Sequence, residues 1–389
     1  MISNNNIPQG YKQTDLGIIP EDWDICTIEE ILDMPTKTRS IASFRSEYYV
    51  STENMISQKR GVVPYLGYLP YSQVREYKSS DILIANIRPY LKKIWMANRC
   101  GGCSSDVIVF RVKDTKTYSS EYVYTILSDD SFFKYSMDSA IGTKMPRGDK
   151  SAIKSYSFII PNDIAEQKAI ATALSDVDAL IAALDKKIAK KKLIKQGAMQ
   201  QLLTGKKRLP GFTEEWVEKK LEEITDIYQP ITISQERFTI DGYNVYGANG
   251  IIGKYSDFNH VTDQVMVTCR GSSCGSINMS TGKSWITGNA MVLNMDKYNI
   301  CKQYVYYYLL NKDINDLITG SGQPQIVRKP LCEYKISIPH SINEQQAIAT
   351  ILSDMDKEIS DLEAKRDKYR LIKQGMMQKL LTGQIRLKI

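Results

Sequence analysis

A long segment of this sequence occurs twice. Residues 166–209 and 344–387 align at a constant offset of 178 without a gap, and 27 of the 44 aligned positions are identical. A chain that contains the same segment twice can arrange two similar parts around an approximate two-fold axis. The duplication therefore constrains the fold more than any other feature, and it favours a target that itself has two halves.

Each copy has the apolar periodicity of a long coiled-coil helix. Apolar residues recur at alternating spacings of four and three, which is the period of about 3.5 residues found at a coiled-coil seam. A helix from about Ala165 to Leu203 would be about 58 Å long at about 1.5 Å per residue, so it needs a partner. We expect the two copies to form an antiparallel coiled coil. The predicted seam is Ile170, Leu174, Val177, Ile181, Leu184 and Ile188, then Ile348, Leu352, Met355, Ile359 and Leu362.

Both copies also carry signals for helix ends. Asp163 with Glu166, and Ser341 with Glu344, have the spacing of a capping box. The glycine of a Thr-Gly pair, Gly205 or Gly383, follows each helix and is predicted to end it.

The net charge of +7 is concentrated in the repeats. Residues 165–209 contain ten basic and four acidic residues, and residues 343–389 contain nine and seven, which leaves a net charge of −1 on the rest. DNA binding by the globular parts would therefore need local basic patches. Six lysines of the first helix are predicted to form a solvated outer face, with contact to a partner protein or to phosphate as the alternative. They are Lys186, Lys187, Lys190, Lys191, Lys192 and Lys195.

A region with short β-branched runs precedes each helix, including DILIANIRPYL in the first half and DQVMVTCRG in the second. GTKMP from Gly142 matches GSGQP from Gly320, so the whole half is duplicated although only the helix stayed nearly identical. We predict an α+β fold with a pseudo-two-fold internal repeat: two α/β domains separated by the two long helices.

Motifs for independent catalysis are absent from the sequence. It contains no GxxxxGK[ST] phosphate loop, no NPPY or DPPY tetrapeptide and no HExxH metal pair. His260 and His340 are interpreted as structural or surface residues. Cys100 and Cys103 form a CGGC spacing without further ligands, and are interpreted as loop residues rather than a zinc site. We expect no catalytic residue, no metal and no cofactor, and reduced thiols in a cytoplasmic protein with no signal peptide or membrane span.

The repeated segments resemble a known family. IAEQKAIATALSDVDALIAAL with LIKQGAMQQLLTG, and INEQQAIATILSDMDKEISDL with LIKQGMMQKLLTG, look like the two conserved helical regions of the specificity subunit of Type I restriction-modification systems. YNVYGANGIIGKY resembles the opening of a target recognition domain in that family. The resemblance covers nearly the full length and implies target recognition domains at 1–160 and 210–338, with helical spacers at 161–209 and 339–389.

The resemblance also implies a function. Family members are non-catalytic subunits that bind an asymmetric bipartite sequence in double-stranded DNA, one recognition domain to each half-site, with the helices setting the gap between the half-sites. They recruit two methyltransferase (modification) subunits, which use S-adenosylmethionine to methylate adenine, and two restriction subunits that use ATP to translocate and cleave DNA. This division of labour would explain the missing catalytic motifs.

Candidate DNA contacts follow from the preferences of side chains for base edges and phosphates. For each one, a solvated loop charge is the alternative interpretation. In the first half they are Arg88, Lys92, Lys93, Lys144, Arg147 and Lys150; in the second half they are Asn249, Arg270, Gln323, Gln325, Arg328 and Lys329.

Two other classes of protein compete with this interpretation. The heptads alone fit a coiled-coil scaffold that joins proteins and has no sequence-specific DNA binding. A self-sufficient restriction-methylation enzyme would need the catalytic motifs that the sequence lacks.

Overall fold

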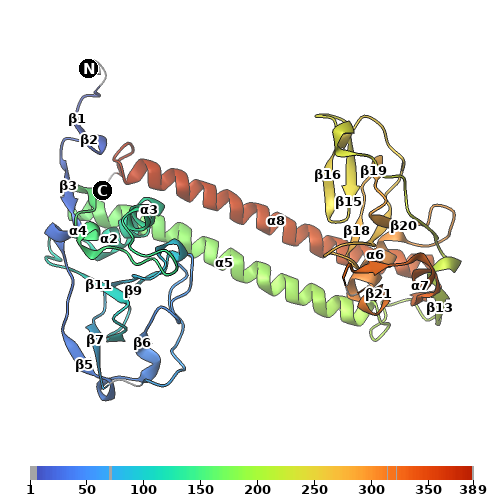
Figure 1. Cartoon of the computed structure of the whole chain (residues 1–389), viewed down its shortest axis with the longest axis horizontal. Coiled ribbons are helices and arrows are strands. Elements are labelled where there is room, and N and C mark those ends of the chain that lie inside the picture. The colour runs from blue at the N-terminus through green and yellow to red at the C-terminus, as the bar shows by residue number, and fades with distance from the viewer. Residues whose placement is uncertain (1–6, 70–71, 313, 321, 388–389) are drawn as a thin grey trace. The chain divides into compact units, whose positions relative to one another are not determined.

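The computed structural model describes residues 7–69, 72–312, 314–320 and 322–387. They form two compact units: unit 1 comprises Met1–Ala183 with Arg366–Ile389, and unit 2 comprises Leu184–Lys365. The boundaries fall inside two 39-residue helices, α5 (Ile164–Leu202) and α8 (Ile342–Leu380). Each unit therefore combines a globular region with the start of the helix that follows it and the end of the other helix (Figure 1).

The globular part of unit 1 contains four short helices and small β-sheets. The largest sheets have the strand orders β5-β7-β10-β6 and β4-β11-β8-β9, and β12 pairs with β3. Its elements are β1 (Tyr11–Thr14), β2 (Gly17–Pro20), β3 (Trp23–Thr27), α1 (Ile28–Ile31), β4 (Leu32–Asp33), β5 (Thr38–Ser40), β6 (Tyr49–Val50), β7 (Gln73–Tyr77), β8 (Ile82–Ala85), β9 (Ile94–Met96), β10 (Gly101–Cys103), β11 (Val107–Val112), α2 (Ser120–Leu127), α3 (Asp130–Asp138), α4 (Lys150–Lys154) and β12 (Ser157–Pro161).

Unit 2 repeats much of this plan. The sheet β14-β20-β17-β18 corresponds to β4-β11-β8-β9, and the β13-β23 pair corresponds to β3-β12. Its elements are β13 (Trp216–Lys220), β14 (Asp226–Tyr228), β15 (Tyr243–Gly247), β16 (Gly250–Tyr255), β17 (Val265–Thr268), β18 (Ile277–Met279), β19 (Ser284–Ile286), β20 (Ala290–Asn294), α6 (Lys302–Asn311), β21 (Ile318–Thr319), β22 (Gln325–Ile326), α7 (Arg328–Glu333) and β23 (Lys335–Pro339). The predicted α+β class with an internal repeat is confirmed.

The start of each long helix is part of a globular core. In unit 1, Ile170 and Leu174 pack with Trp23 and Phe110, and in unit 2 the matching Ile348 and Leu352 belong to the second large core. Farther along the seam, Leu184, Ile188 and Ile359 are buried, and Val177, Ile181, Met355 and Leu362 are half-buried. Full burial of one such aliphatic side chain stabilises the fold by about 1.5–3 kcal/mol. The seam thus joins helix to helix and also fastens each helix to its own domain.

Ion pairs show that the helices run in opposite directions within each unit. In unit 2, Lys191 lies 2.6 Å from Glu358, and Lys195, four residues later, pairs with Asp356, two residues earlier. In unit 1, Lys373 lies 2.7 Å from Asp178, and Arg386, farther along the chain, pairs with Glu166, which precedes Asp178. The antiparallel pairing expected from the repeat is therefore present in both units.

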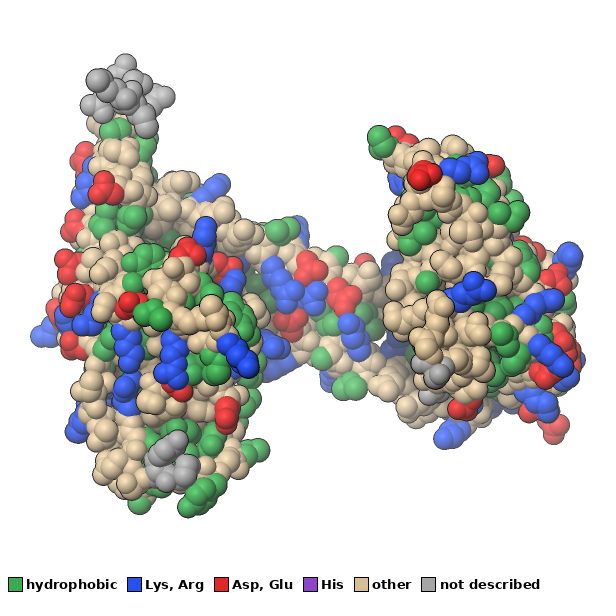
Figure 2. All heavy atoms as spheres, in the orientation of Figure 1, with side chains coloured by type: hydrophobic (Ala, Val, Ile, Leu, Met, Phe, Trp, Pro, Cys, Tyr) green, Lys and Arg blue, Asp and Glu red, His purple; other side chains and the backbone are tan. Residues whose placement is uncertain are grey.

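The lysine face of α5 differs from its prediction. Lys191, Lys192 and Lys195 pair with Glu358, Glu363 and Asp356 of α8 rather than lying in a purely solvated face. Charged residues beside a coiled-coil seam commonly form such interhelical pairs. The acidic residues of the second repeat thus offset part of the charge of the first, and blue and red side chains alternate along the helices (Figure 2).

A buried ion pair, rather than a capping box, fixes the start of each long helix. Asp163 caps α5 by accepting a hydrogen bond from the Ala165 amide at 2.8 Å. The Glu166 carboxylate, however, accepts from the guanidinium of Arg386. The matching Glu344 accepts from Arg208 at 2.7 and 2.8 Å. The capping-box prediction is wrong for both glutamates because each meets an arginine that follows the other helix.

The neighbouring glutamines attach the helix starts to the globular regions. Gln167 accepts from the Ser119 amide at 2.8 Å, and Gln345 accepts from the Cys301 amide at 2.9 Å. These amides lie at the N-termini of α2 and α6, where the first N–H groups have no partner within the helix. Each repeated Glu-Gln pair therefore locks one globular region to both long helices. Within the described ranges, no helix is long and apolar enough to cross a membrane.

Candidate nucleic-acid interface

In unit 1 the structure brings together the two loops that carry the predicted DNA contacts. After β8, Ile87 forms a bridge with Arg147. The amide of Arg88 donates to the carbonyl of Pro146 at 2.8 Å, and the amide of Gly148 donates to that of Asn86 at 3.1 Å. We call residues 86–93 together with 141–150 loop edge 1.

Unit 2 repeats this arrangement. Arg270, which follows β17, bridges to Gln325, and the Gly271 amide donates to the Pro324 carbonyl at 3.2 Å. We call residues 269–275 together with 319–320 and 322–329 loop edge 2. The backbone therefore places Ile87 and Arg147 of loop edge 1 where loop edge 2 has Arg270 and Gln325. Both edges have the same backbone pairing but different side chains.

The basic side chains of loop edge 1 fall into two groups. Arg88, Lys144 and Lys150 are exposed, and Arg147 is 58% exposed although it lies 3.2 Å from Asp106. Lys92 instead pairs with Asp130 at 2.8 Å, and Lys93 donates to the carbonyl of Thr52. Burial lowers the pKa of Lys93, and the positive charge of Arg88 lowers it further. The side chains of Lys92 and Lys93 therefore bind other residues of unit 1.

The predicted contacts of loop edge 2 are mostly open to solvent. Arg270, Gln323, Gln325 and Lys329 are exposed, whereas the Nε of Arg328 donates to the carbonyl of Ile227 at 2.6 Å.

Asn249 lies outside loop edge 2, in the turn between β15 and β16. The carbonyl of Ala248, in the same turn, accepts hydrogen bonds from Thr268 and Asn278. Since Thr268 is the last residue of β17, this turn is tied to the strand that leads into loop edge 2.

Sequence reasoning missed exposed apolar residues of loop edge 1. Tyr90 is 49% exposed, Met145 49% and Ile141 69%. Apolar side chains can contact the thymine methyl group in the major groove. Their position beside basic residues in RPYLKK and GTKMPRG is the sequence signal that could have identified them.

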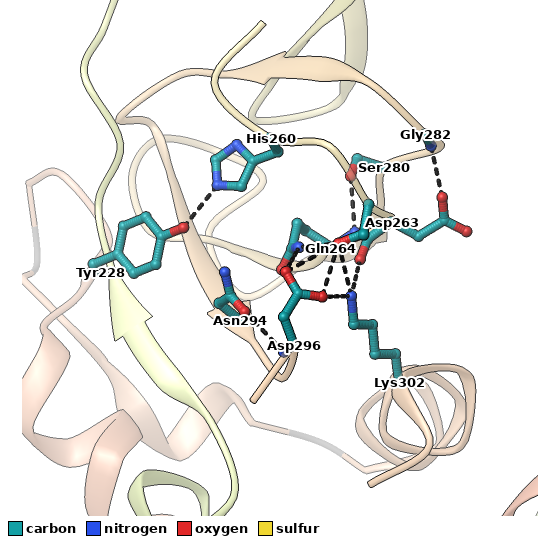
Figure 3. Close-up of polar contacts among 10 residues, drawn as sticks. Tyr228, His260, Asp263, Gln264, Ser280, Gly282, Asn294, Asp296 and Lys302 are labelled. Carbon is teal, nitrogen blue, oxygen red and sulfur yellow. Dashed lines mark hydrogen bonds and ion pairs between the residues drawn. The ribbon is translucent and has the colours of Figure 1, made fainter. Parts of the chain in front are cut away.

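The two histidines have different surroundings. His260 is buried, and its Nε2 lies 2.8 Å from the Tyr228 hydroxyl (Figure 3). Its Nδ1 lies 2.6 Å from Asn259. Burial lowers its pKa and favours the neutral ring. His340 is largely exposed, 3.4 Å from Glu214. Neither ring lies in a loop edge.

Beside His260, a second polar cluster braces unit 2. Asp296 accepts from Gln264 at 3.1 Å and from Thr262 at 2.8 Å, and pairs with Lys302 at the start of α6 (Figure 3). Burial raises the pKa of Asp296, but these hydrogen bonds outweigh it and leave the pKa below its usual range.

Cys103 of the CGGC motif is buried, which raises its pKa to about 12, whereas Cys100 is exposed. In the part of the chain that the structure describes, no group of three or more His, Cys, Asp or Glu residues is placed to hold a metal ion.

The sequence of this chain is similar to those of known proteins. The model of the Type I restriction modification DNA specificity domain matches the chain twice, at residues 20–193 and 213–369. The MjaVIII specificity subunit of a Type I restriction enzyme from Methanocaldococcus jannaschii is 24% identical over 95% of this chain and 94% of its own length. The EcoprrI specificity subunit from Escherichia coli is 30% identical over 29% of this chain and 28% of its own.

Two solved structures have a fold similar to that of this chain. The S subunit of a Type I restriction-modification system from M. genitalium superposes with a TM-score of 0.70 at 18% identity, covering 92% of this chain and 96% of that one. A chain from a study of Type I complex assembly gives a TM-score of 0.57 at 18% identity, with coverages of 94% and 99%. Because the family model matches both halves, this chain belongs to the family of Type I restriction-modification DNA specificity subunits.

Proposed function

We propose that this chain reads a bipartite, asymmetric sequence in double-stranded DNA, unit 1 binding one half-site and unit 2 the other. In this proposal α5 and α8 set the gap between the half-sites. Two methyltransferase subunits and two restriction subunits assemble on the chain, and catalysis belongs to them. We further propose the sequence boundaries 1–160, 161–209, 210–338 and 339–389 for the two recognition domains and the two spacers.

The proposal rests mainly on the structural equivalence of loop edge 1 and loop edge 2. Both are built from the end of a central strand bridged to a Gly-Pro loop, at Ile87–Arg147 and at Arg270–Gln325. Such a scaffold presents different side chains from one backbone, as two readers of unlike half-sites require. A protein that acts only as a spacer would not need exposed hydrogen-bond donors at equivalent positions of its two units.

The exposed side chains fit the chemistry of base edges. Arginine matches the O6 and N7 acceptors of guanine, and glutamine or asparagine matches adenine, whereas lysine mainly contacts phosphate. We therefore assign Arg88, Arg147, Arg270, Gln323, Gln325 and Asn249 to base contacts. Lys144, Lys150 and Lys329 are assigned to phosphates, and Arg328, Lys92 and Lys93 to supporting positions at the same edges.

The helices offer two matching surfaces for two copies of one partner. The repeated Leu-Ile-Lys-Gln-Gly sequence exposes Leu193 by 68% and Ile194 by 46% on α5, and Leu371 by 70% and Ile372 by 40% on α8. Adjacent exposed apolar residues on a charged helix indicate a protein contact. Since the pair occurs identically on both helices, it supports docking of two methyltransferase subunits.

The decisive experiment reconstitutes the full chain with its methyltransferase subunits. A randomised duplex library bound by this complex should yield one bipartite sequence, and binding should weaken steeply with salt because phosphate contacts release counterions. The enriched duplex should bind far more tightly than a scrambled duplex of equal length. Equal affinity for both would instead favour a coiled-coil scaffold without sequence-specific DNA binding. Methyl transfer by the isolated chain would contradict its assignment as a non-catalytic subunit.

A further inference from the structure

A turn in loop edge 1 has an unusual backbone. Residues Pro89–Leu91 form a single 3-10 turn, and the residues on either side, Arg88 and Lys92, have φ of 54° and 50°. This left-handed conformation is disfavoured for residues with a β-carbon. Only five non-glycine residues in the described parts of the chain have positive φ, and these two flank the same turn.

Unit 2 builds the same turn from glycine. After β17, Gly271 and Gly275 have φ of 88° and 89°, and the Cys274 amide donates to the Gly271 carbonyl at 3.0 Å. In unit 1 the Leu91 amide donates to the Arg88 carbonyl at 2.9 Å. Glycine adopts this backbone without strain. The fold alone therefore does not require arginine or lysine at these two positions.

Lys92 has a partner that accounts for its position. Its ammonium lies 2.8 Å from Asp130, which also binds Lys59 at 2.6 Å. The carbonyl of Lys92 accepts from the Lys59 amide at 2.9 Å. Lys92 thus links the turn to α3, and this contact compensates for its backbone.

Arg88 has no such compensation. Its side chain is exposed and makes no hydrogen bond or ion pair with any described residue, and its charge acts on the neighbouring Lys93. Its backbone is nevertheless held firmly, because its amide donates to the carbonyl of Pro146 at 2.8 Å and the next residue, Pro89, is buried. A strained residue whose side chain makes no stabilising contact within the fold is the kind that persists for function.

We propose that Arg88 reads a guanine in the half-site of unit 1, and that its left-handed backbone fixes the guanidinium outward for this contact. The inference rests on the proposed function and names the residue that sets specificity in one half-site. The planar guanidinium can donate two hydrogen bonds to the O6 and N7 of guanine. Unit 2 lacks a side chain at the matching Gly271, so it reads through Arg270 and Gln325 beside the turn.

The test replaces Arg88 by glycine, the residue that unit 2 uses. Full-length Arg88→Gly, reconstituted with the methyltransferase subunits, selects sequences from a randomised bipartite duplex library beside the wild type. We expect one guanine position in one half-site to become unspecified, with a loss of about tenfold in discrimination, and the other half-site to stay unchanged. The Tm of the variant should equal or exceed that of the wild type because the substitution removes backbone strain.

Three variants serve as controls. Ser80→Gly relieves a left-handed residue (φ 68°) in the turn between β7 and β8, and should leave both half-sites unchanged. Arg88→Lys should retain overall affinity but lose discrimination for guanine, because an ammonium cannot form the paired contact. Arg270→Ala should alter the other half-site.

The outcomes separate this inference from the proposed function. A wild-type complex that enriches no sequence contradicts both. A wild type that enriches a bipartite sequence, with Arg88→Gly selecting the same guanine, overturns only the role of Arg88. A uniform loss of affinity in Arg88→Gly for every sequence also overturns it, because that result identifies a phosphate contact.

Discussion

Glu166 and Glu344 occupy matching positions, yet their surroundings differ in detail. Arg386 binds both Glu166 and Asp22, and the indole of Trp23 donates to Glu166 at 3.2 Å. In unit 2 the indole nitrogen of Trp216 is buried without a hydrogen-bond partner among the described residues. At the scale of residues, the carboxylate of Glu166 in unit 1 therefore has more hydrogen-bond donors than that of Glu344 in unit 2. Loss of Arg386 would leave the Glu166 carboxylate buried without its counter-ion.

The first prediction concerns this carboxylate. Glu166 is only 3% exposed in the pair, so Arg386→Ala should destabilise the protein by about 3 kcal/mol through an uncompensated buried charge. Urea unfolding followed by circular dichroism measures this loss. The double variant Arg386→Ala with Glu166→Gln should recover part of it, and a double variant no more stable than Arg386→Ala would show that the charge is not the cause.

The second prediction concerns matching residues of the two loop edges. Arg147→Ala and Gln325→Ala should each weaken binding of the preferred duplex by about 1–3 kcal/mol and relax specificity in one half-site only, a different one for each variant. Competition binding against duplexes mutated in one half-site measures both effects. Relaxation of the same half-site by both variants would contradict the assignment of one reader to each unit.

At the scale of elements, each long helix changes character along its length. The first half buries Ile170 and Leu174, or Ile348 and Leu352, in a globular core, whereas the second half exposes a Leu-Ile pair. This Leu-Ile pair is identical in both repeats although it is exposed, which is why we assign it to partner docking.

The third prediction tests this docking surface. Leu371→Glu with Ile372→Glu should leave the chain folded, because both side chains are exposed, but should remove one methyltransferase subunit. The matched pair Leu193→Glu with Ile194→Glu should remove the other, and the four-fold variant both. Native mass spectrometry of the reconstituted complex gives the stoichiometry. Two bound subunits in the four-fold variant would place the contact elsewhere.

The sequence predicted elements better than contacts. The spacing of Ile170, Leu174 and their repeats predicted both helices and their antiparallel pairing, because periodicity is local and duplication implies a partner. For Glu166 the short-range motif predicts a capping box, but its partner Arg386 lies 220 residues away and no local pattern indicates it. The left-handed backbone of Arg88 could not be predicted, since it depends on tertiary contacts with Pro146 and not on local propensity.

At the scale of the whole molecule, the two repeats have to act as one spacer if the proposed function is correct. Each helix is continuous over 39 residues and contributes to both units. Its length would then determine the number of bases between the half-sites.

The fourth prediction changes this length. Deleting or inserting four residues near Ile181, about one helical turn, keeps the helical face in register. We expect the preferred gap to change while both half-sites stay the same, as selection from a library with variable gaps would reveal. Altered half-sites with an unaltered gap would contradict a measuring role for the helices.

Unit 1 is built from both ends of the chain, and this has a consequence for biosynthesis. Its first 183 residues emerge early from the ribosome, but Arg386 and the end of α8 are translated only after all of unit 2. Until then nascent unit 1 lacks part of its core and the counter-ion of Glu166. A chain that ends at residue 365 would therefore contain all of unit 2, which is made later, but would leave unit 1, which is made first, without its last segment.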